Sequence, residues 1–309
     1  MFKYILRRTL MIIPVMFGVS IIVFSIMLLT PGDPARLMLG ERAPEAQLEA
    51  IRERLGLNEP PHIQYVNWVS GVAQLDFGRS IRSNRPVINE IQQRLPATIE
   101  LAVLATLLAV AIGIPVGVLS AMRPNSAGDN VATVTTFTML AIPVFWQGLM
   151  MMIIFSVWLG WLPATGRGQS WQYYILPVVT LGTSAIASIA RMTRSTMMET
   201  IKLDYVRTAR SKGLSGMRVV YGHALRNALL PVVTIIGLQF GSLLSGAVIT
   251  ETIFSWPGIG SLAVDSMRAK DFPVVQGVVL VFAFAYAIVN LLVDIAYGFL
   301  DPRLATRYS

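Results

Sequence analysis

Long stretches without a charged residue constrain this 309-residue sequence more than any other feature. A helix needs about 20 apolar residues to cross the hydrocarbon core of a bilayer. Six predominantly apolar windows of that length contain no Asp, Glu, Lys or Arg: Thr9–Gly32, Leu101–Met122, Asn130–Gly166, Gly168–Ala190, Asn227–Thr250 and Phe272–Val293. The sequence therefore predicts an all-α polytopic membrane protein with six transmembrane helices. The third window exceeds one span, so its helix is expected at Thr133–Leu159, with a loop after it.

Composition supports a lipid bilayer as the solvent of this chain. Hydrophobic residues make up 54% of it and charged residues 14%, whereas a soluble domain carries about 25% charged residues. The net charge of +8 is attributed to basic cytoplasmic loops, because no RNA-binding motif or basic–aromatic stripe accompanies it, and no nucleic-acid partner is expected. The absence of cysteine excludes disulfides and thiolate metal sites. The two histidines, His62 and His223, lie far apart in sequence, so no metal site is expected.

Basic residues at the ends of the spans predict the topology. Lys3, Arg7 and Arg8 precede the first window, and Arg303 and Arg307 follow the last. Positive charge favours the cytoplasmic side, so both termini are expected inside a multi-pass protein of the cell (inner) membrane. A cleaved signal peptide is the alternative for the first window. A retained anchor is favoured because no small-x-small cleavage site follows the apolar run.

Residues 31–96 form a long polar segment that the six-span topology places outside. Its eight acids balance its eight arginines. Apolar spacing predicts short helices at Pro44–Leu55, around Tyr65 and Trp68, and at Val87–Leu95, the last lying along the interface before Pro96 opens span two. The chain is thus divided into 1–95, the first span plus an extracytoplasmic helical segment, and 96–309, the transmembrane core. The segment is either a platform for a substrate-delivering partner or a cap that stiffens the outer face.

A basic island between spans four and five is the strongest candidate for a functional loop. Residues 191–231 carry eight cations and only two acids, Glu199 and Asp204. A helix is expected at Tyr205–Lys212, with Gly213 at its C′ position and Ser215 as the N-cap of a second helix running to Asn227. Ala209 and Gly213 lie four residues apart, which places them on one helix face where another backbone could approach. The loop is therefore either a docking element for a soluble partner or an ordinary positive-inside loop. Its cations are Arg191, Arg194, Lys202, Arg207, Arg210, Lys212, Arg218 and Arg226.

No catalytic constellation accompanies these elements. The sequence contains no G-x4-G-K-[ST], no H-E-x-x-H and no paired carboxylates within a span, so neither ATP hydrolysis nor intramembrane proteolysis is expected of this chain. Asp294 lies near the inner end of span six and is assigned a structural role, paired with an arginine. Gln239 is the better pathway candidate, although a polar residue on a small-residue face serves equally as helix–helix glue. The candidate pathway residues are Gln147, Gln239, Ser242 and Asn290.

The basic island resembles the cytoplasmic signature loop of ABC-transporter permeases, E-A-A-x3-G-x9-I-x-L-P. Arg207-Thr208-Ala209 is followed by Gly213 and, nine residues further on, by the sequence HALR, so the Ala, the Gly, the spacing and the Leu match while the leading Glu, the Ile and the final Pro do not. That departure is similar to the permeases for dipeptides, oligopeptides, glutathione and nickel. Further marks of that subgroup recur along the chain: PGDPA at 31–35, DFGRSI at 76–81, RPV at 85–87, LRNALLPVVT at 225–234, ETIFSWPGIG at 251–260 and DPR at 301–303.

The resemblance implies a fold, partners and a mechanism. The fold would be a type I ABC importer transmembrane domain, with a coupling loop at 191–228. A second homologous permease would complete the translocation pathway, two cytoplasmic ATPases would bind ATP and Mg²⁺, and an extracytoplasmic binding protein would deliver the substrate, for which peptides are favoured. The chain itself would need no cofactor. The resemblance assigns contact with the ATPase to Tyr205, Arg207, Thr208, Ala209, Arg210, Lys212, Gly213, Leu214 and Ser215.

Two other classes of function remain open from the residues themselves. A self-contained secondary transporter or channel would need coupling-ion or proton-relay groups at the midplane. A membrane enzyme would need a catalytic constellation. The first is the main alternative to an ATP-driven permease.

Overall fold

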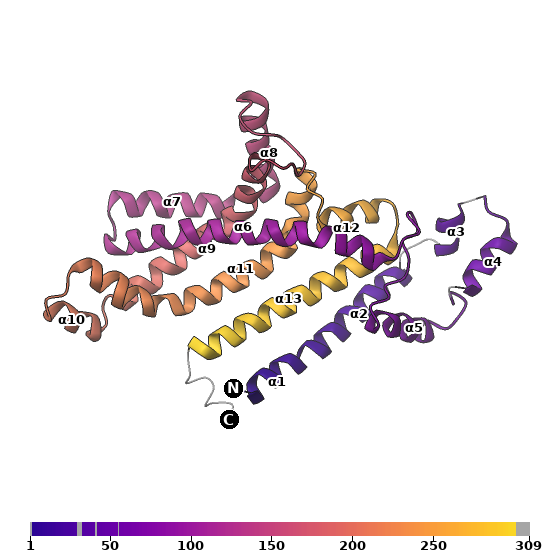
Figure 1. The fold of residues 1–309 in the computed structure, drawn as a ribbon, viewed down its shortest axis with the longest axis horizontal. Coiled ribbons are helices and arrows are strands. Elements are labelled where there is room, and N and C mark those ends of the chain that lie inside the picture. Colours follow the sequence, from indigo (N-terminus) through magenta and orange to yellow (C-terminus); the bar gives the residue numbers. More distant parts are fainter. Residues whose placement is uncertain (1, 30–32, 41, 55, 301–309) are drawn as a thin grey trace.

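A computed structural model describes residues 2–29, 33–40, 42–54 and 56–300, which form helices and connecting turns. Some residues used in the sequence analysis lie outside these ranges: Pro31, Gly32, Arg303, Arg307 and the DPR sequence. Figure 1 shows the long helices running roughly in one direction, with α10 at one end of the bundle and α12 with α3, α4 and α5 at the other. These are called the α10 end and the α12 end below.

The helices agree with the predicted spans. Five continuous stretches are long and apolar enough to cross a membrane: 5–29, 87–122, 172–200, 218–253 and 272–296. The α-helices are α1 Phe2–Leu10, α2 Ile12–Leu29, α3 Pro34–Leu39, α4 Glu45–Arg54, α5 Pro61–Ala73, α6 Val87–Met122, α7 Ala127–Ala141, α8 Val144–Met152, α9 Gln172–Thr200, α10 Asp204–Ser211, α11 Leu225–Ile253, α12 Ile259–Arg268 and α13 Phe272–Leu300. Two π-helices, η1 Ile153–Trp158 and η2 Arg218–Ala224, extend α8 and precede α11.

The third predicted span is broken, so the expectation of a single helix at Thr133–Leu159 was wrong. Helix α7 begins earlier, where the Ser126 hydroxyl accepts a hydrogen bond from the Asp129 N–H. It ends at Ala141, and α8 with η1 departs from it at an angle of 101°. Pro143 causes the break, since it disfavours the helical conformation in Ile142, which is extended. The α8–η1 arm points away from the other helices in Figure 1, and several of its large apolar side chains are exposed.

Helix α6 also differs from the prediction. The expected interfacial helix at Val87–Leu95 and the second span form one helix of 36 residues that contains Pro96. Its first turns are held in place by packing, because Val87 and Ile91 are buried in an apolar cluster with residues of α12 and α13. This tertiary contact keeps the helix continuous through a proline that was expected to start a new helix. The expected domain boundary at residue 96 therefore falls within α6.

The predicted helices of the 31–96 segment are present as α4 and α5. Arg52 of α4 donates hydrogen bonds to Asp33 at 2.6 and 3.0 Å, to Glu45 at 2.8 Å and to Glu49 at 3.0 Å. Burial raises the pKa of Asp33, but the bonds from Arg52 and from the Ala35 N–H outweigh it, so the pKa lies below its usual value. This carboxylate cluster fastens α3 to α4 at the α12 end.

Small residues bring α6 and α9 into close contact at the centre of the bundle. In the second half of α6, every fourth position is small and buried: Ala105, Ala109, Gly113, Gly117 and Ala121. A Cβ on Gly117 would lie 2.5 Å from Thr193 Cβ and 2.6 Å from the Ala190 carbonyl oxygen of α9. Without side chains in the way, the two backbones approach closely, which is how helices associate in a bilayer. The α6–α9 pair is the core onto which α11 packs.

We expect Gly117→Ala to destabilise the protein because the added methyl overlaps both the Thr193 side chain and the α9 backbone. Overpacking of this kind costs about 1–3 kcal/mol. Gly18→Ala in α2 is the matched control, since a Cβ there meets no atom within 4 Å. Thermal unfolding of the two variants in detergent should show a lower midpoint for Gly117→Ala alone. Equal midpoints would contradict the close α6–α9 contact.

Candidate functional site: the α10 seat and its connection to the α12 end

Helix α10 forms where the sequence predicts it. It runs from Asp204 to Ser211 and is capped by Lys212; the next residue, Gly213, has a φ of +78°, the left-handed conformation that favours glycine. The Gly213 N–H donates to the Arg210 carbonyl at 3.0 Å and closes the helix. The C′ role of Gly213 is thus confirmed.

One face of α10 packs against the rest of the chain. Val206 is fully buried and Ala209 is 6% exposed. They join an apolar cluster from the ends of α6, α9, η2 and α11, called the seat below: Val118, Ala121, Met197, Val206, Ala209, Val219, Val220, Ala224 and Ala228. The seat connects α10 to the central helices, so a displacement of α10 moves residues of all of them.

The burial of Ala209 corrects the expected small-residue docking face. Ala209 lies under α10, whereas Gly213 is exposed beyond its end, so the two do not present one outer surface. The helix stops before Gly213, which removes the helical geometry that would align them. Of the remaining expected contact residues, Leu214 is half-buried and the rest are exposed: Tyr205, Arg207, Thr208, Arg210, Lys212 and Ser215.

The second predicted helix does not end at Asn227. Helical structure begins at Gly216, after Ser215, and the stretch 218–253 is one continuous span. Nothing between Leu225 and Leu230 breaks a helix, and Pro231 lies within it. Asn227 instead anchors α10, because its amide nitrogen donates to the Tyr205 hydroxyl at 2.8 Å.

An ion pair fixes α7 against α9 near the seat. Arg194 donates to both carboxylate oxygens of Asp129, at 2.6 and 2.8 Å. The Asn125 N–H also donates to Asp129, at 2.9 Å. The Asp129 side chain is 2% exposed, so the contact is shielded from water. The sequence contains no signal for this pairing, since the two residues lie 65 positions apart and in different helices.

A second polar junction lies at the α12 end, where α11 turns into α12. The Thr98 hydroxyl of α6 donates to the buried Glu251 carboxylate at 2.6 Å and accepts from the Ile259 N–H at 2.9 Å. Glu251 also accepts from the Ser261 N–H at 2.9 Å, and a Cβ on Gly258 would overlap its carboxylate. The Trp256 indole donates to the Ala97 carbonyl at 2.9 Å. The ETIFSWPGIG sequence thus forms hydrogen bonds with α6 at Ala97 and Thr98.

Aromatic residues gather around this junction. Tyr174 meets Trp256 edge to face with ring centroids 5.1 Å apart, and the Arg167 guanidinium lies 5.7 Å from the Trp256 ring. Arg167 also donates to Glu100 at 2.5 Å. Burial lowers the pKa of Arg167, but Tyr174 and Glu100 outweigh it and raise the pKa above its usual value. The junction therefore joins α6, α9 and the loop between η1 and α9.

The candidate pathway residues separate into two groups. Gln147 donates to the Thr183 hydroxyl at 2.6 Å, so it fastens α8 to α9. Gln239, Ser242 and Asn290 form no side-chain hydrogen bond with any other residue that the structure describes. Ser242 lies on an exposed face of α11 with Leu238, Ser245, Gly246 and Ile249.

Asp294 has the structural contact that the sequence predicted. Arg8 of α1 lies 3.1 Å from its carboxylate and ties the first span to α13. Within the described ranges, no group of three or more His, Asp or Glu side chains could hold a metal ion.

Two protein families match the chain. Residues 113–306 match the binding-protein-dependent transport system inner membrane component, and residues 1–102 match the N-terminal part of such membrane components. The chain belongs to the family of binding-protein-dependent transport system inner membrane components. Its members are permease subunits of ABC importers in the inner membrane, and ATP hydrolysis takes place on separate ATPase subunits. This settles the choice against a self-contained secondary transporter or channel and against a membrane enzyme.

Similar proteins cover the full chain. A dipeptide transport system permease protein, DppB, of Alkalihalophilus pseudofirmus is 43% identical, with 98% of this chain and 99% of that protein aligned. A glutathione transport system permease protein, GsiC, of Salmonella choleraesuis is 44% identical with 100% of both chains aligned. The GsiC of Escherichia coli is 42% identical over the same extent.

Solved structures share the fold at low sequence identity. An inward-facing form of the MetNI methionine ABC transporter matches with a TM-score of 0.58 and 18% identity, covering 68% of this chain and 96% of that one. An amino acid ABC transporter matches with a TM-score of 0.55 and 16% identity, covering 68% and 93%. The fold is that of a type I ABC importer transmembrane domain.

We expect Thr98→Val to destabilise the α12-end junction. The variant keeps the side-chain shape but leaves the Glu251 carboxylate and the Ile259 N–H each short of one partner, and a buried unsatisfied group costs about 1–3 kcal/mol. Thr252→Val is the control, because the exposed Thr252 hydroxyl bonds only to Val248 of its own helix. Thermal unfolding in detergent should separate the two variants. An unfolding midpoint for Thr98→Val as high as that of the control would disprove the role of Thr98.

Proposed function

We propose that this chain forms half of the translocation pathway for di- or oligopeptides in an ATP-driven importer. The relatives named for dipeptide and glutathione transport support a peptide-type substrate, since glutathione is itself a small peptide. A second homologous permease would lie beside this chain, and an extracytoplasmic binding protein would deliver the substrate. ATP and Mg²⁺ would be bound by two cytoplasmic ATPase subunits, and this chain would hold no cofactor.

The observation that carries the proposal is the position of α10. It projects at one end of the bundle with an exposed polar face, while its apolar face rests on the seat where α6, α9 and α11 converge. An ATPase that moves the exposed face would displace these helices together. The contact residues are those exposed on α10 and just after it. Ala209 lies on the buried face of α10, so it transmits the motion to the seat and does not touch the partner.

The exposed face of α11 supports a pathway assignment for Gln239 and Ser242. Small or polar groups there have no partner within the described part of the chain, whereas a lipid-facing surface favours apolar side chains. Asn290 of α13 belongs to the same assignment. Gln147 is instead assigned to the α8–α9 contact.

We expect Gly213→Arg to abolish uptake while the protein still inserts in the membrane. A bulky cation beyond the end of α10 would block the close approach of the ATPase. Gly213→Asn is the control, because asparagine tolerates the left-handed conformation better than other residues and adds no charge. ATP-dependent dipeptide uptake should be lost in the first variant and largely kept in the second. Unchanged uptake in Gly213→Arg would remove the coupling assignment.

Single cysteines provide a test of topology, because the sequence contains none of its own. Ser211 of α10 and Ser83 near the α12 end are both exposed. With the α10 end and both termini cytoplasmic, Ser83→Cys should react with a membrane-impermeant thiol reagent in intact cells. Ser211→Cys should react only after permeabilisation. The reverse pattern would overturn the proposed orientation.

A further inference from the structure

A pocket lies behind α10, between it and the ends of α6 and α9. Its volume is about 410 Å³. The seat residues Ala121 and Val220 form its buried base. Met122 and Pro124 line it from the end of α6 and the turn beyond, Met198 and Ile201 from α9 and its C-terminal cap, and Gly216 from the start of the next helical stretch. Most of the lining is therefore apolar.

Two cations complete the lining of this pocket. Lys202 and Arg210 are exposed, and no acidic side chain lines the pocket. Neither cation forms an ion pair with any residue of the described ranges. The ammonium and guanidinium groups are thus available to an external anion. An apolar base beside two cations suits a ligand with an anionic group and a hydrocarbon part.

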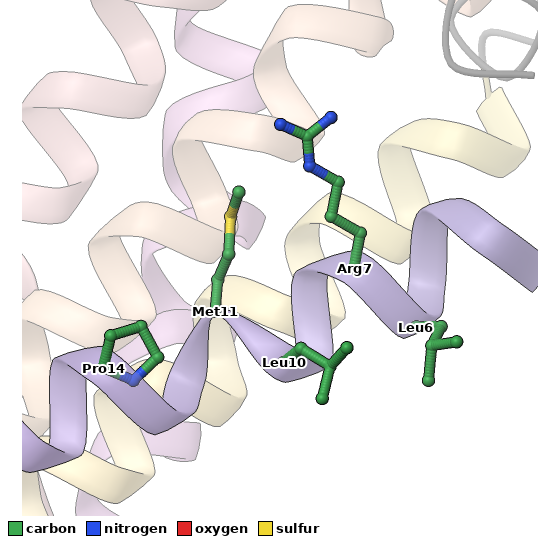
Figure 2. Close-up of a pocket in the computed structure, with 5 residues that line it drawn as sticks. All are labelled: Leu6, Arg7, Leu10, Met11 and Pro14. Carbon is green, nitrogen blue, oxygen red and sulfur yellow. The ribbon is translucent and has the colours of Figure 1, made fainter.

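The place of the pocket identifies the source of such a ligand. Helix α6 ends at Met122 and α9 at Thr200, so the pocket lies at the ends of two stretches that are long and apolar enough to cross a membrane. Phospholipid headgroups occupy this layer, and basic pockets between membrane helices on the cytoplasmic side bind anionic headgroups. The pocket at α1 and α2 has one cation in its lining instead of two. Its lining residues are Leu6, Arg7, Leu10, Met11 and Pro14. Figure 2 shows Arg7 and Met11 on one side of the helix and Leu6 and Leu10 on the other.

We propose that the pocket behind α10 binds an anionic phospholipid of the cytoplasmic leaflet. Lys202 and Arg210 pair with the headgroup phosphate, and the first methylene groups of an acyl chain contact Met122, Met198 and Ile201. The inference rests on the proposed orientation, with the α10 end cytoplasmic. A bound lipid would fill the space between α10 and the ends of α6 and α9. It would thereby stiffen the route by which α10 moves the spans.

The test measures lipid retention by native mass spectrometry of the full chain, purified without its partners and incubated with phosphatidylglycerol. We expect Lys202→Gln combined with Arg210→Gln to lower the affinity by about 30-fold, since each cation near a charged membrane surface contributes about a factor of five. Arg218→Gln combined with Arg226→Gln is the matched control. It removes the same charge from exposed positions of the same basic island, residues 191–231, that do not line the pocket.

A second variant separates a lipid from free phosphate. A Cβ on Gly216 meets no atom within 4 Å, so Gly216→Leu adds apolar bulk to the pocket lining without a clash at the backbone. It should reduce phosphatidylglycerol retention while both cations remain. Retention unaffected by Gly216→Leu, together with equal binding of inorganic phosphate, would reduce the site to a simple anion contact and overturn the lipid assignment.

The remaining outcomes are decisive as well. Equal lipid retention in the Lys202/Arg210 and Arg218/Arg226 double variants would overturn the proposal. So would a Lys202/Arg210 variant that keeps its lipid but no longer co-purifies with the ATPase, because the two cations would then be a protein contact only. Loss of lipid in the Lys202/Arg210 variant but not in the control supports the proposal whether or not co-purification weakens, since Arg210 is itself among the proposed ATPase contacts. Since retention is measured without transport, failure here is distinguishable from failure of the coupling role, which the Gly213→Arg uptake assay reports.

Discussion

The close contact between α6 and α9 is the constraint on which the rest of the molecule depends. In a bilayer the lipid tails are as apolar as the side chains, so burial gives little reason for two helices to associate. Close backbone packing supplies that reason here, and it requires small residues at every fourth position in the second half of α6. Helix α11 then packs against the pair, and the N-terminal span adds to the outside through α13. The α6–α9 pair thus lies at the centre of the bundle and the N-terminal span at its edge.

The two functional ends are built with different chemistry on the same helices. At the α10 end, apolar contacts form the seat, and the hydrogen bond from Asn227 to Tyr205 ties α10 to α11. At the α12 end, Thr98, Glu251 and Trp256 form a hydrogen-bonded junction that holds one geometry. Helices α6 and α11 reach both ends. The α10 end is suited to receive motion, and the α12 end is suited to hold α6 and α11 in one position.

Sequence patterns predicted the parts of this structure that local chemistry determines. The charge-free windows predicted the spans, and Gly213 marked the end of α10 because glycine adopts the left-handed conformation without a steric cost. Contacts between residues far apart in the sequence could not be predicted from these patterns. The continuity of α6 through Pro96 depends on Val87 and Ile91 meeting α12 and α13, and the burial of Ala209 depends on Val219 and Val220 folding beneath it. The break at Pro143 was readable in principle, since proline restricts the residue before it.

The unbroken stretch 218–253 has a mechanical consequence. At about 1.5 Å per residue, its 36 residues form a rod roughly 54 Å long. A tilt of about 5° around one tip would carry the opposite tip through about 5 Å, which is close to one helical turn. Leverage of this size needs no local unfolding and no rearrangement along the rod. A small tilt at the α10 end would therefore become a displacement of about 5 Å at the α12 end.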